Sequence, residues 1–412
     1  MWSLLNSKTF KALSTTPRLW RRTVTTQSLI YRKFGQPSNE LQIIEEDVPN
    51  PIGKQVLIKI LRAPVNRMDL DIIQGSVFIV PYLGHNFFEI SLLGTHPFKP
   101  KILPAIGGGE FVGEVVKVGE LVVDLNEGDL VIPLRMHLGS WTKYKLAEKE
   151  EVYKIPEYSD LKEAATIGAN TCAAYRLLKG FVNLRPGDSI IQNGANGFVG
   201  QTIHKLCKLW GIKSLGVIRD RPDAGVLKLA MERLGATVVL TDKEIDTTDV
   251  YKANCLQKPK LALNCTGGEM AESIARHLDK CGIMVTYAGV SGKPFKISAL
   301  SSLILNEQRF TGFWITKWVE ENLGSPHHVR MMNELIRLLQ ANKLKTPPLE
   351  IIPFDDFKEA FATCDSTSKR FMLDMTADED VKWIGEGLCP LVPLGPCSNF
   401  GGKKEVKKSG KK

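Results

Sequence analysis

The chain has 412 residues, of which 43% are hydrophobic and 24% charged, and its formal net charge is +9. These values are ordinary for a globular protein of two or three domains with an ample core. The charge sits at the two ends, because removing the +7 of residues 1–39 and the +5 of residues 403–412 leaves −3. The folded body is therefore not basic, and we predict no nucleic-acid partner.

Apolar run lengths and cysteine spacing argue against a membrane-spanning protein and against a protein held by disulfides or zinc. No apolar run reaches the ~20 residues that a membrane-spanning helix needs, so we predict no membrane span. None of the eight cysteines forms a C-x-x-C pair, which argues against a disulfide framework or a zinc knuckle and suits a reducing compartment. The cysteines stand at positions 172, 207, 255, 265, 281, 364, 389 and 397.

Residues 1–28 have the composition of a mitochondrial transit peptide. They contain five Lys/Arg and no acid, with Leu, Phe and Trp spread between the cations. This gives an amphipathic, cationic segment without the compact apolar core of a secretory signal. We predict import into the mitochondrial matrix; a disordered basic tail is the alternative. At the other end, residues 376–412 read as a disordered basic tail.

Residues 29–167 read as a β-rich domain. Short apolar strands alternate with Gly, Pro, Asn and Asp turns up to about residue 146, as in a barrel-like module. Gly107, Gly113 and Gly119 recur every six residues, at positions that favour turns or close backbone contacts. Between them, Gly109 precedes Glu110.

A dinucleotide-binding pattern spans Ile190–Pro222 and is the strongest signal in the sequence. It reads as a strand, a G-x-x-G-x-x-G turn, a helix and a second strand: Ser189–Gln192, Gly194 to Gly200, Phe198–Trp210 and Ser214–Ile218. Glycine permits the tight turn and the close approach of backbone to pyrophosphate, which the N–H groups at the helix start then bind. A purely structural strand-to-helix turn is the alternative.

The residues after the second strand select the cofactor. An NAD site usually has an acid there, bonded to the ribose 2′-hydroxyl. This chain has Arg219, Asp220 and Arg221, and two guanidinium groups suit the 2′-phosphate of NADPH. A solvated basic turn is the alternative, and Asp220 leaves NAD open.

Strands and helices alternate through the rest of residues 168–310, which predicts a doubly wound parallel sheet, that is, a Rossmann domain. The predicted elements are helix Ala224–Gly235, strands Thr237–Thr241 and Lys260–Asn264, helix Glu269–Gly282 and strand Ile283–Tyr287. A further amphipathic helix is predicted over Ser325–Asn342, within a segment, 311–375, that returns to the first domain.

The stretch 104–119 and the later glycine turn resemble the medium-chain dehydrogenase/reductase superfamily. The resemblance implies an α/β fold with a GroES-like β-rich catalytic domain, a Rossmann domain and an active site in the cleft between them. Zinc-dependent members carry a histidine ligand where this chain has Gly109, and the cysteine lobe that holds a structural zinc is absent. We therefore predict no metal. Hydride transfer without zinc suits an activated C=C bond better than an alcohol.

Six segments resemble the mitochondrial trans-2-enoyl-acyl-carrier-protein reductases, and the resemblance covers residues 29–375. The segments are 164–176, 187–193, 217–222, 262–268, 284–290 and 312–318. The resemblance implies NADPH-dependent reduction of trans-2-enoyl thioesters of acyl carrier protein or CoA, in mitochondrial fatty acid synthesis. It also implies a homodimer joined edge to edge through the Rossmann sheets.

Matching positions imply a set of cofactor residues. Those near the nicotinamide and acyl cleft are Asn170, Tyr287, Ala288, Gly289, Val290, Phe313, Trp314 and Ile315. Those near the phosphates are Asn196, Gly197, Phe198, Val199, Arg219, Asp220 and Arg221, with Lys369 closing the site. From the residues alone, Phe313 and Trp314 could equally be core, Asn170 a cap or turn residue, and Lys369 a solvated charge.

This chain lacks the family's proton-donor tyrosine at its usual position. The family has a tyrosine in a Q-G-x-Y loop, where this chain has Val77 after Gln74 and Gly75, and residues 76–102 are about twenty residues longer than usual. We assign the donor to Tyr82, the tyrosine of this apolar insertion; a packed tyrosine is the alternative. The insertion is a lid or a product of gene modelling or splicing. Asn66 matches the family and would support the active-site loop.

Two other functions remain open from the residues. A quinone or enone reductase would use the same cofactor on a different substrate. A non-catalytic NADPH-binding regulator would explain the missing tyrosine and the long insertion.

Overall fold

The structure is a computed structural model that describes residues 23–75, 100, 102–136, 138–157, 160–247, 249–254, 256–297, 300–364 and 370–376. Tyr82, Lys369 and the segments 1–22 and 377–412 lie outside the described residues. None of the helices within the described ranges is long and apolar enough to cross a membrane.

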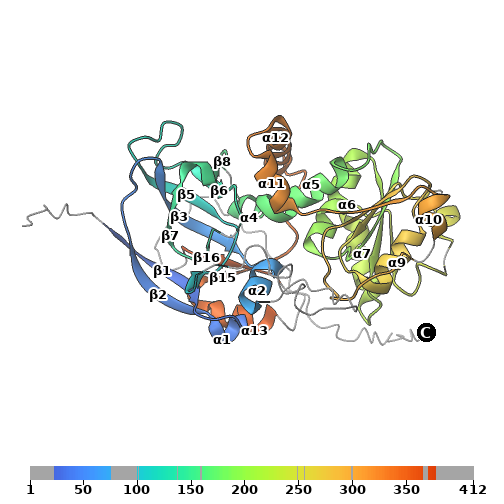
Figure 1. The fold of residues 1–412 in the computed structure, drawn as a ribbon, viewed down its shortest axis with the longest axis horizontal. Coiled ribbons are helices and arrows are strands. Elements are labelled where there is room, and N and C mark those ends of the chain that lie inside the picture. Colours follow the sequence, from blue (N-terminus) through green and yellow to red (C-terminus); the bar gives the residue numbers. More distant parts are fainter. Residues whose placement is uncertain are drawn as a thin grey trace, which may run out of the picture. The chain divides into compact units, whose positions relative to one another are not determined.

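Part of the described chain builds a six-stranded parallel sheet (Figure 1). Its strands are β9 (Ser189–Asn193), β10 (Lys213–Ile218), β11 (Val238–Thr241), β12 (Leu261–Asn264), β13 (Ile283–Thr286) and β14 (Arg309–Gly312). Their order is β11-β10-β9-β12-β13-β14, so the chain runs outward from β9 in one direction and then from β12 in the other. Ligands of such sheets bind at the carboxyl ends of the strands near this switch point.

Apolar side chains on both faces of this sheet pack against helices, which confirms the predicted doubly wound sheet. The packed helices are α5 (Cys172–Lys179), α6 (Phe198–Trp210), α7 (Ala224–Leu234), α8 (Val250–Ala253) and α9 (Gly268–Arg276), whereas α10 (Leu300–Ile304) has no buried residue. Ile190 and Val285 pack in one core with residues of α5 and α6, whereas Ile191 and Met284 pack in another with residues of α9. Neighbouring strand residues point to opposite faces, so each strand supplies both cores.

The predicted elements of this part are confirmed, with small differences at their ends. Helix α6 begins and ends at the predicted residues, and the Gly211 that follows has the left-handed φ of +71° that ends a helix. Helix α9 ends at Arg276, earlier than the predicted Gly282. The N–H groups of His277 and Leu278 bond back three residues, so the helix tightens into a turn there.

The remaining strands form two sheets of a β-rich part. The described strands are β1 (Val24–Tyr31), β2 (Gln42–Val48), β3 (Gln55–Pro64), β4 (Ala105–Ile106), β5 (Val112–Val118), β6 (Leu130–Pro133), β7 (Tyr144–Glu148), β8 (Val152–Lys154), β15 (Glu350–Pro353) and β16 (Phe371–Asp374). Among these residues one sheet has the order β2-β1-β4 and the other β15-β16-β3-β5-β6-β8, with β7 also paired to β3. Strand β16 pairs with β3, so residues 371–374 join the sheet of the β-rich part.

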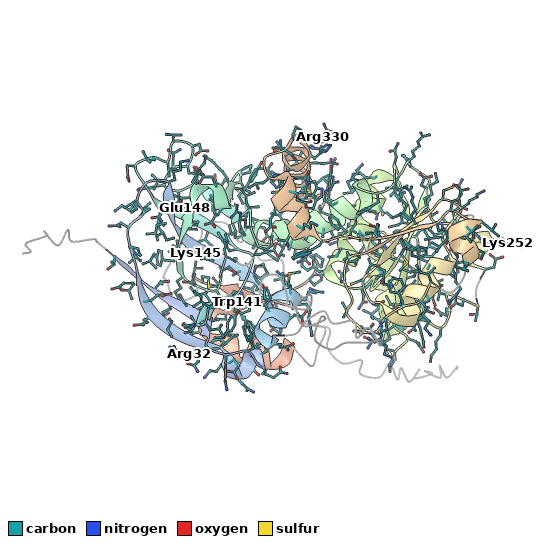
Figure 2. The ribbon with its side chains drawn as sticks, in the orientation of Figure 1. Arg32, Trp141, Lys145, Glu148, Lys252 and Arg330 are labelled. Carbon is teal, nitrogen blue, oxygen red and sulfur yellow. The ribbon has the colours of Figure 1, made fainter. Side chains whose placement is uncertain are left out.

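Helices and short helical turns complete the fold. They are α1 (Pro37–Glu40), α2 (Arg67–Gln74), α4 (Leu161–Ala165), α11 (Ile315–Asn322), α12 (Pro326–Gln340), α13 (Phe357–Cys364), the 3-10 turns η1 (Lys149–Glu151) and η3 (Phe354–Asp356), and the π-helical turn η2 (Ile167–Thr171). Within the β-rich part, Trp141 is fully buried and meets Phe361 edge to face at 4.9 Å between ring centroids (Figure 2). This places α13 over the core of that part.

Two domain limits differ from those expected. Strand β1 begins at Val24, before the expected limit at Leu29. The hydroxyl groups of Thr26 and Ser28 are buried in this strand and contact Thr142. Ser28 Oγ donates to Thr142 Oγ1 at 2.8 Å, and Thr26 Oγ1 lies 3.1 Å from the same atom. Strand β14 extends the parallel sheet to Gly312, beyond residue 310.

Candidate active site

The glycine turn after β9 is built so that side chains would block it. Gly194 has a φ of +60°, and a Cβ there would lie 3.1 Å from Cys265 Cβ. A Cβ on Gly200 would lie 2.6 Å from the carbonyl oxygen of Ala195. The turn therefore needs a left-handed residue at its start and no side chain where the first turn of α6 meets the turn backbone. These are the requirements of a dinucleotide-binding turn.

The start of α6 brings together four of the predicted cofactor residues. Gly197 is the N-cap, Asn196 precedes it, and Phe198 and Val199 are the first helical residues. The first N–H groups of a helix lack intrahelical acceptors, and the helix dipole adds partial positive charge there. The structure therefore places Asn196, Gly197, Phe198 and Val199 at a helix start, which is the kind of position that favours a bound anion.

Arg370 adds a full positive charge at this turn. Its guanidinium carbon lies 5.5 Å from the centre of the Phe198 ring, and a Cβ on Gly197 would lie 3.9 Å from an Arg370 Nη. Arg370 was not among the predicted cofactor residues, and the predicted Lys369, its neighbour, lies outside the described residues. The signal was present in the Ser368-Lys369-Arg370 run, where either cation could serve.

Two buried asparagines link the carboxyl ends of β9 and β12. Asn193 Nδ2 donates to Asn264 Oδ1 at 2.8 Å, and Asn193 Oδ1 accepts from the backbone N–H of Cys265 at 2.6 Å and of Thr266 at 3.1 Å. Both side chains are fully buried. They hold the loop after β12 against the glycine turn. Sequence reasoning missed them, although each stands at the end of a buried apolar strand.

The segment after β13 lies next to this loop. The Tyr287 N–H donates to the Asn264 carbonyl at 3.0 Å, and the Val290 N–H donates to the Cys265 carbonyl at 3.1 Å. Burial and the nearby Cys265 thiol raise the pKa of Tyr287 well above its usual value. Ala288 and Gly289, which follow Tyr287 in the chain, are half-buried, and Val290 is exposed. The predicted residues 287–290 therefore lie beside the glycine turn.

The predicted adenosine-phosphate residues follow β10. Arg219 and Asp220 are exposed, and Arg221 is half-buried with its Nε 2.8 Å from Asp223 Oδ1. Asp220 is ion-paired to Lys243 at 2.5 Å. Both arginines thus lie at the carboxyl edge of the sheet, Arg221 in an ion pair with Asp223.

Phe313, Trp314 and Ile315 link β14 to α11. Phe313 donates its N–H to the Thr286 carbonyl at 2.9 Å, and its ring meets Phe181 edge to face at 5.6 Å. Trp314 is the half-buried N-cap of α11. Ile315 is 8% exposed and packs in the core with residues of α5 and α12, so its side chain is a core residue. Phe313 and Trp314 are only partly buried, which leaves them surface to contact a ligand.

A second polar network surrounds Asn170, in the π-helical turn η2. Its Nδ2 donates to Asn66 Oδ1 at 2.8 Å, and Asn66 Nδ2 donates to Glu110 Oε2 at 2.8 Å. The other oxygen, Glu110 Oε1, accepts from the Ala169 N–H at 2.6 Å. Glu110 thereby holds both the turn and the residue that orients Asn170. Asn66 thus lies between Asn170 and Glu110 in this network, and Glu110 was not among the predicted site residues.

Two carboxyl groups of this network have raised pKa values. Glu110 is 1% exposed, and burial raises its pKa to about 7 against the bonds from Ala169, Asn66 and Gly168. Burial raises the pKa of Asp69 to about 8, with smaller contributions from Glu110 and Asp71, although the Asn66 N–H donates to it at 2.8 Å. Perturbed acids beside a cavity are typical of functional sites. Asp69 lines such a cavity, of 270 Å³, together with Tyr31, Ile72 and Gly108.

Two families of domains match the chain. The alcohol dehydrogenase GroES-like domain matches residues 53–157, and the zinc-binding dehydrogenase matches residues 234–370. Zinc has no donor set at the position expected for it, because Gly109 has no side chain and the Glu110 carboxylate is held by N–H groups. Within the described residues no three His, Cys, Asp or Glu side chains form a metal-holding group. The residues present do not fit a catalytic zinc.

Whole proteins match over most of the chain. The mitochondrial enoyl-acyl-carrier-protein reductase of Xenopus tropicalis is 35% identical over 339 residues, which are 81% of this chain and 90% of that protein. The human protein of the same name is 33% identical over 336 residues, covering 81% and 84%.

Solved structures agree with these matches. Etr1p in complex with NADP and crotonyl-CoA is 28% identical, with a TM-score of 0.72 over 85% of this chain and 100% of that one. The Etr1p/Etr2p heterodimer, a mitochondrial 2-enoyl thioester reductase from Candida tropicalis, is 26% identical with a TM-score of 0.72 over the same shares. This chain belongs to the mitochondrial enoyl-acyl-carrier-protein reductase family.

Proposed function

We propose that this protein reduces trans-2-enoyl thioesters to saturated acyl thioesters with NADPH, in mitochondrial fatty acid synthesis. The observation that carries the proposal is 35% identity to an enoyl-acyl-carrier-protein reductase over 81% of the chain. The site supports it, because the glycine turn, the start of α6, Arg219 and Arg221 suit the phosphates of NADPH. The relative Etr1p was solved with NADP and crotonyl-CoA, the class of cofactor and substrate proposed.

The residues divide the work between binding and proton transfer. NADPH, when bound, would supply the hydride that reduces the β-carbon of the enoyl group. The start of α6 and Arg370 would hold the pyrophosphate, and Asn170, whose amide is held by Asn66, would contact the nicotinamide side. Tyr82 delivers the proton to the α-carbon as a general acid, on the enolate that forms beside the thioester carbonyl.

The decisive experiment is NADPH oxidation with trans-2-hexenoyl-CoA and trans-2-decenoyl-CoA. The protein should begin near residue 23, because β1 starts at Val24. Wild-type turnover is expected, and Tyr82→Phe should lose roughly a hundredfold or more of it if Tyr82 is the acid. Turnover unaffected by that substitution removes Tyr82 from the mechanism. Activity on free quinones with none on thioesters would select a quinone reductase, and NADPH binding without any turnover a regulator.

The carrier of the substrate is a separate question. We propose that acyl carrier protein and CoA both present the thioester, since the reacting group is the same on each. Equal kcat with a lower KM for the enoyl-acyl carrier protein would indicate that the carrier protein itself is recognised. Turnover of CoA esters alone would remove the carrier protein from the proposal.

We further propose a homodimer formed along β14. This strand ends the parallel sheet among the described strands, and beside it Val290, Leu300, Ile304 and Leu305 are each between 64% and 72% exposed. Such a patch beside a free strand edge favours pairing with a second copy. Light scattering should give a dimer that Leu300→Glu with Ile304→Glu converts to monomer. Leu121→Glu, at another exposed leucine, is the control, and a wild-type monomer overturns the dimer.

Import into the matrix is proposed from the first residues. A fusion of residues 1–23 to a fluorescent protein should reach the matrix, and replacement of Arg18, Arg21 and Arg22 by glutamine should prevent it. Cytosolic fluorescence of the unmodified fusion would contradict the targeting role.

A further inference from the structure

Lys243 lies at the carboxyl edge of the parallel sheet, beside the segment proposed to bind the adenosine phosphate. Strands β10 and β11 pair in parallel with Ile218 opposite Thr241, so the residues that follow each strand are also neighbours. The Asp220 N–H donates to Asp242 Oδ1 at 2.8 Å. Lys243 Nζ lies 2.5 Å from Asp220 Oδ2. The loop after β11 therefore brings a cation onto the one acid between the two arginines.

The charges at this edge balance only when Lys243 is counted. Asp220, Asp223 and Asp242 carry three negative charges, and Arg219, Arg221 and Lys243 carry three positive ones. The next residue, Glu244, is neutralised by Lys228 at 2.7 Å. Without Lys243 the edge has a net negative charge, which opposes a phosphate dianion. With Lys243 the acid is neutralised and the two arginines can act on the ligand.

Asp220 would otherwise suit the other cofactor. An acid that follows the second strand of a Rossmann domain accepts a hydrogen bond from the ribose 2′-hydroxyl of NAD. In this protein an oxygen of that acid is already bound to Lys243. The ion pair thus neutralises Asp220, the acid that would favour NADH. It also places Lys243 as a third cation beside Arg219 and Arg221, which favour NADPH.

We propose that Lys243 is a cofactor-specificity residue, which neutralises Asp220 and completes, with Arg219 and Arg221, a site for the 2′-phosphate of NADPH. The proposal rests on NADPH being the cofactor, as proposed above, and assigns the choice between NADPH and NADH to a residue outside the glycine turn and outside the segment 219–221.

The position is suited to a clean test. Lys243 is 78% exposed and Asp220 38%, and exposed ion pairs contribute little to stability, so Lys243→Met should fold normally. Lys252 is a matched control on the same part of the chain (Figure 2). It is 90% exposed and lies 3.6 Å from Asp249 in another surface ion pair.

The experiment is calorimetric titration of the full chain with four ligands: NADPH, NADH, 2′,5′-ADP and 5′-AMP. Wild type, Lys243→Met, Lys252→Met, Asp220→Asn and the Lys243→Met/Asp220→Asn double variant are compared. Loss of one cation from a phosphate site should weaken NADPH and 2′,5′-ADP about tenfold in Lys243→Met and leave NADH and 5′-AMP unchanged or tighter. The double variant should recover most of the NADPH affinity, because it removes the exposed acid as well.

Each outcome has a defined meaning. The expected loss in Lys243→Met, absent from Lys252→Met and smaller in 0.5 M salt, supports the proposal, since salt screens exposed charges. Equal NADPH affinity in the two variants overturns it, as does an equal loss for NADPH and NADH. A wild type that binds neither NADPH nor 2′,5′-ADP overturns the proposed function together with this inference, so the two failures are distinguishable.

Discussion

Asn170 donates a side-chain amide hydrogen to the side-chain oxygen of Asn66 at 2.8 Å, and this bond fixes both amides. Asn66 Nδ2 is committed to Glu110, so Asn66 Oδ1 must face Asn170. The amide nitrogen of Asn170 is committed in turn, and its oxygen is directed away from Asn66. A buried carboxylate therefore decides which amide group Asn170 offers where we propose the nicotinamide.

Glu110→Gln should test this arrangement. The ionised carboxylate accepts from Asn66 and Ala169, whereas glutamine directs an amide donor at one of them. We expect kcat/KM to fall about tenfold at pH 8, with a smaller effect on overall stability. Because the pKa of Glu110 is raised to about 7, the wild type should itself lose activity below pH 7, as its carboxyl gains a proton.

The ratio of wild-type to variant activity is the informative measurement. It should be large at pH 8 and approach unity near pH 6, where the wild-type acid resembles the amide. Asp69 and Cys172 also interact with Glu110, so the profile should be repeated in Asp69→Asn. Glu150→Gln, at an exposed acid, is the control. A ratio that stays constant with pH would assign Glu110 a purely structural role.

The sequence predicted the cofactor turn and its helix because their signals are local. Glycine spacing, a β-branched strand and helical periodicity lie within a few residues of one another, and α6 begins and ends where predicted. Local signals also explain why the first residues of β1 were assigned to the transit peptide, since a Ser/Thr-rich segment has the composition of one. Only tertiary contact with Thr142 shows that these hydroxyls are buried strand residues.

The Glu110 network could not be predicted from local signals. Asn66, Glu110 and Asn170 come from three segments, and the bonds join positions 44 and 104 residues apart. Each residue alone is an ordinary polar residue at a turn or helix end. Which amide meets which carboxylate depends on how η2, α2 and the strand before Glu110 meet, and no periodicity encodes that.

Asp69→Asn should change how stability depends on pH. Because the pKa of Asp69 is raised from about 3.8 to about 8, the folded state keeps a proton that the unfolded chain releases. Stability due to this group therefore falls as pH rises from about 4 to 8. Asparagine can still accept from the Asn66 N–H and carries no charge. Between pH 6 and 8 the wild type should lose about 2 kcal/mol more than the variant in urea unfolding.

Parallel pH dependences of the two proteins would contradict the raised pKa of Asp69. Because Asp69 and Glu110 interact, the comparison should be repeated in the Glu110→Gln background, where Glu110 no longer titrates. The measurement should use the unfolding free energy, since activity also depends on Glu110.

Gly200→Ala should weaken the cofactor turn. Its new Cβ would lie 2.6 Å from the Ala195 carbonyl oxygen, a distance that forces the first turn of α6 away from the backbone of the glycine turn. We expect a loss of about 1–3 kcal/mol in stability and weaker NADPH binding by calorimetry. Gly225→Ala, in α7, is the matched control. Among the described residues nothing lies within 4 Å of that Cβ, so the helix should gain about 0.5–1 kcal/mol. Equal effects of the two substitutions would contradict the steric argument.

His204 should make the protein sensitive to acid, opposite in sign to Asp69. Gln192 Nε2 lies 3.0 Å from His204 Nε2, and Ser214 Oγ lies 2.8 Å from Nδ1, so a neutral ring with its hydrogen on Nδ1 satisfies both contacts. Burial lowers the pKa of His204 from 6.5 to about 3. The unfolded chain therefore gains a proton first, and stability is lost as pH falls from 6.5 toward 3. At pH 5 the loss should be about 2 kcal/mol.

Since burial also lowers the pKa values of His277 and His328, the test compares wild type with His204→Asn. The variant should lack this share of the loss. A His204 imidazole that titrates near 6.5 by NMR in the folded protein would contradict its lowered pKa.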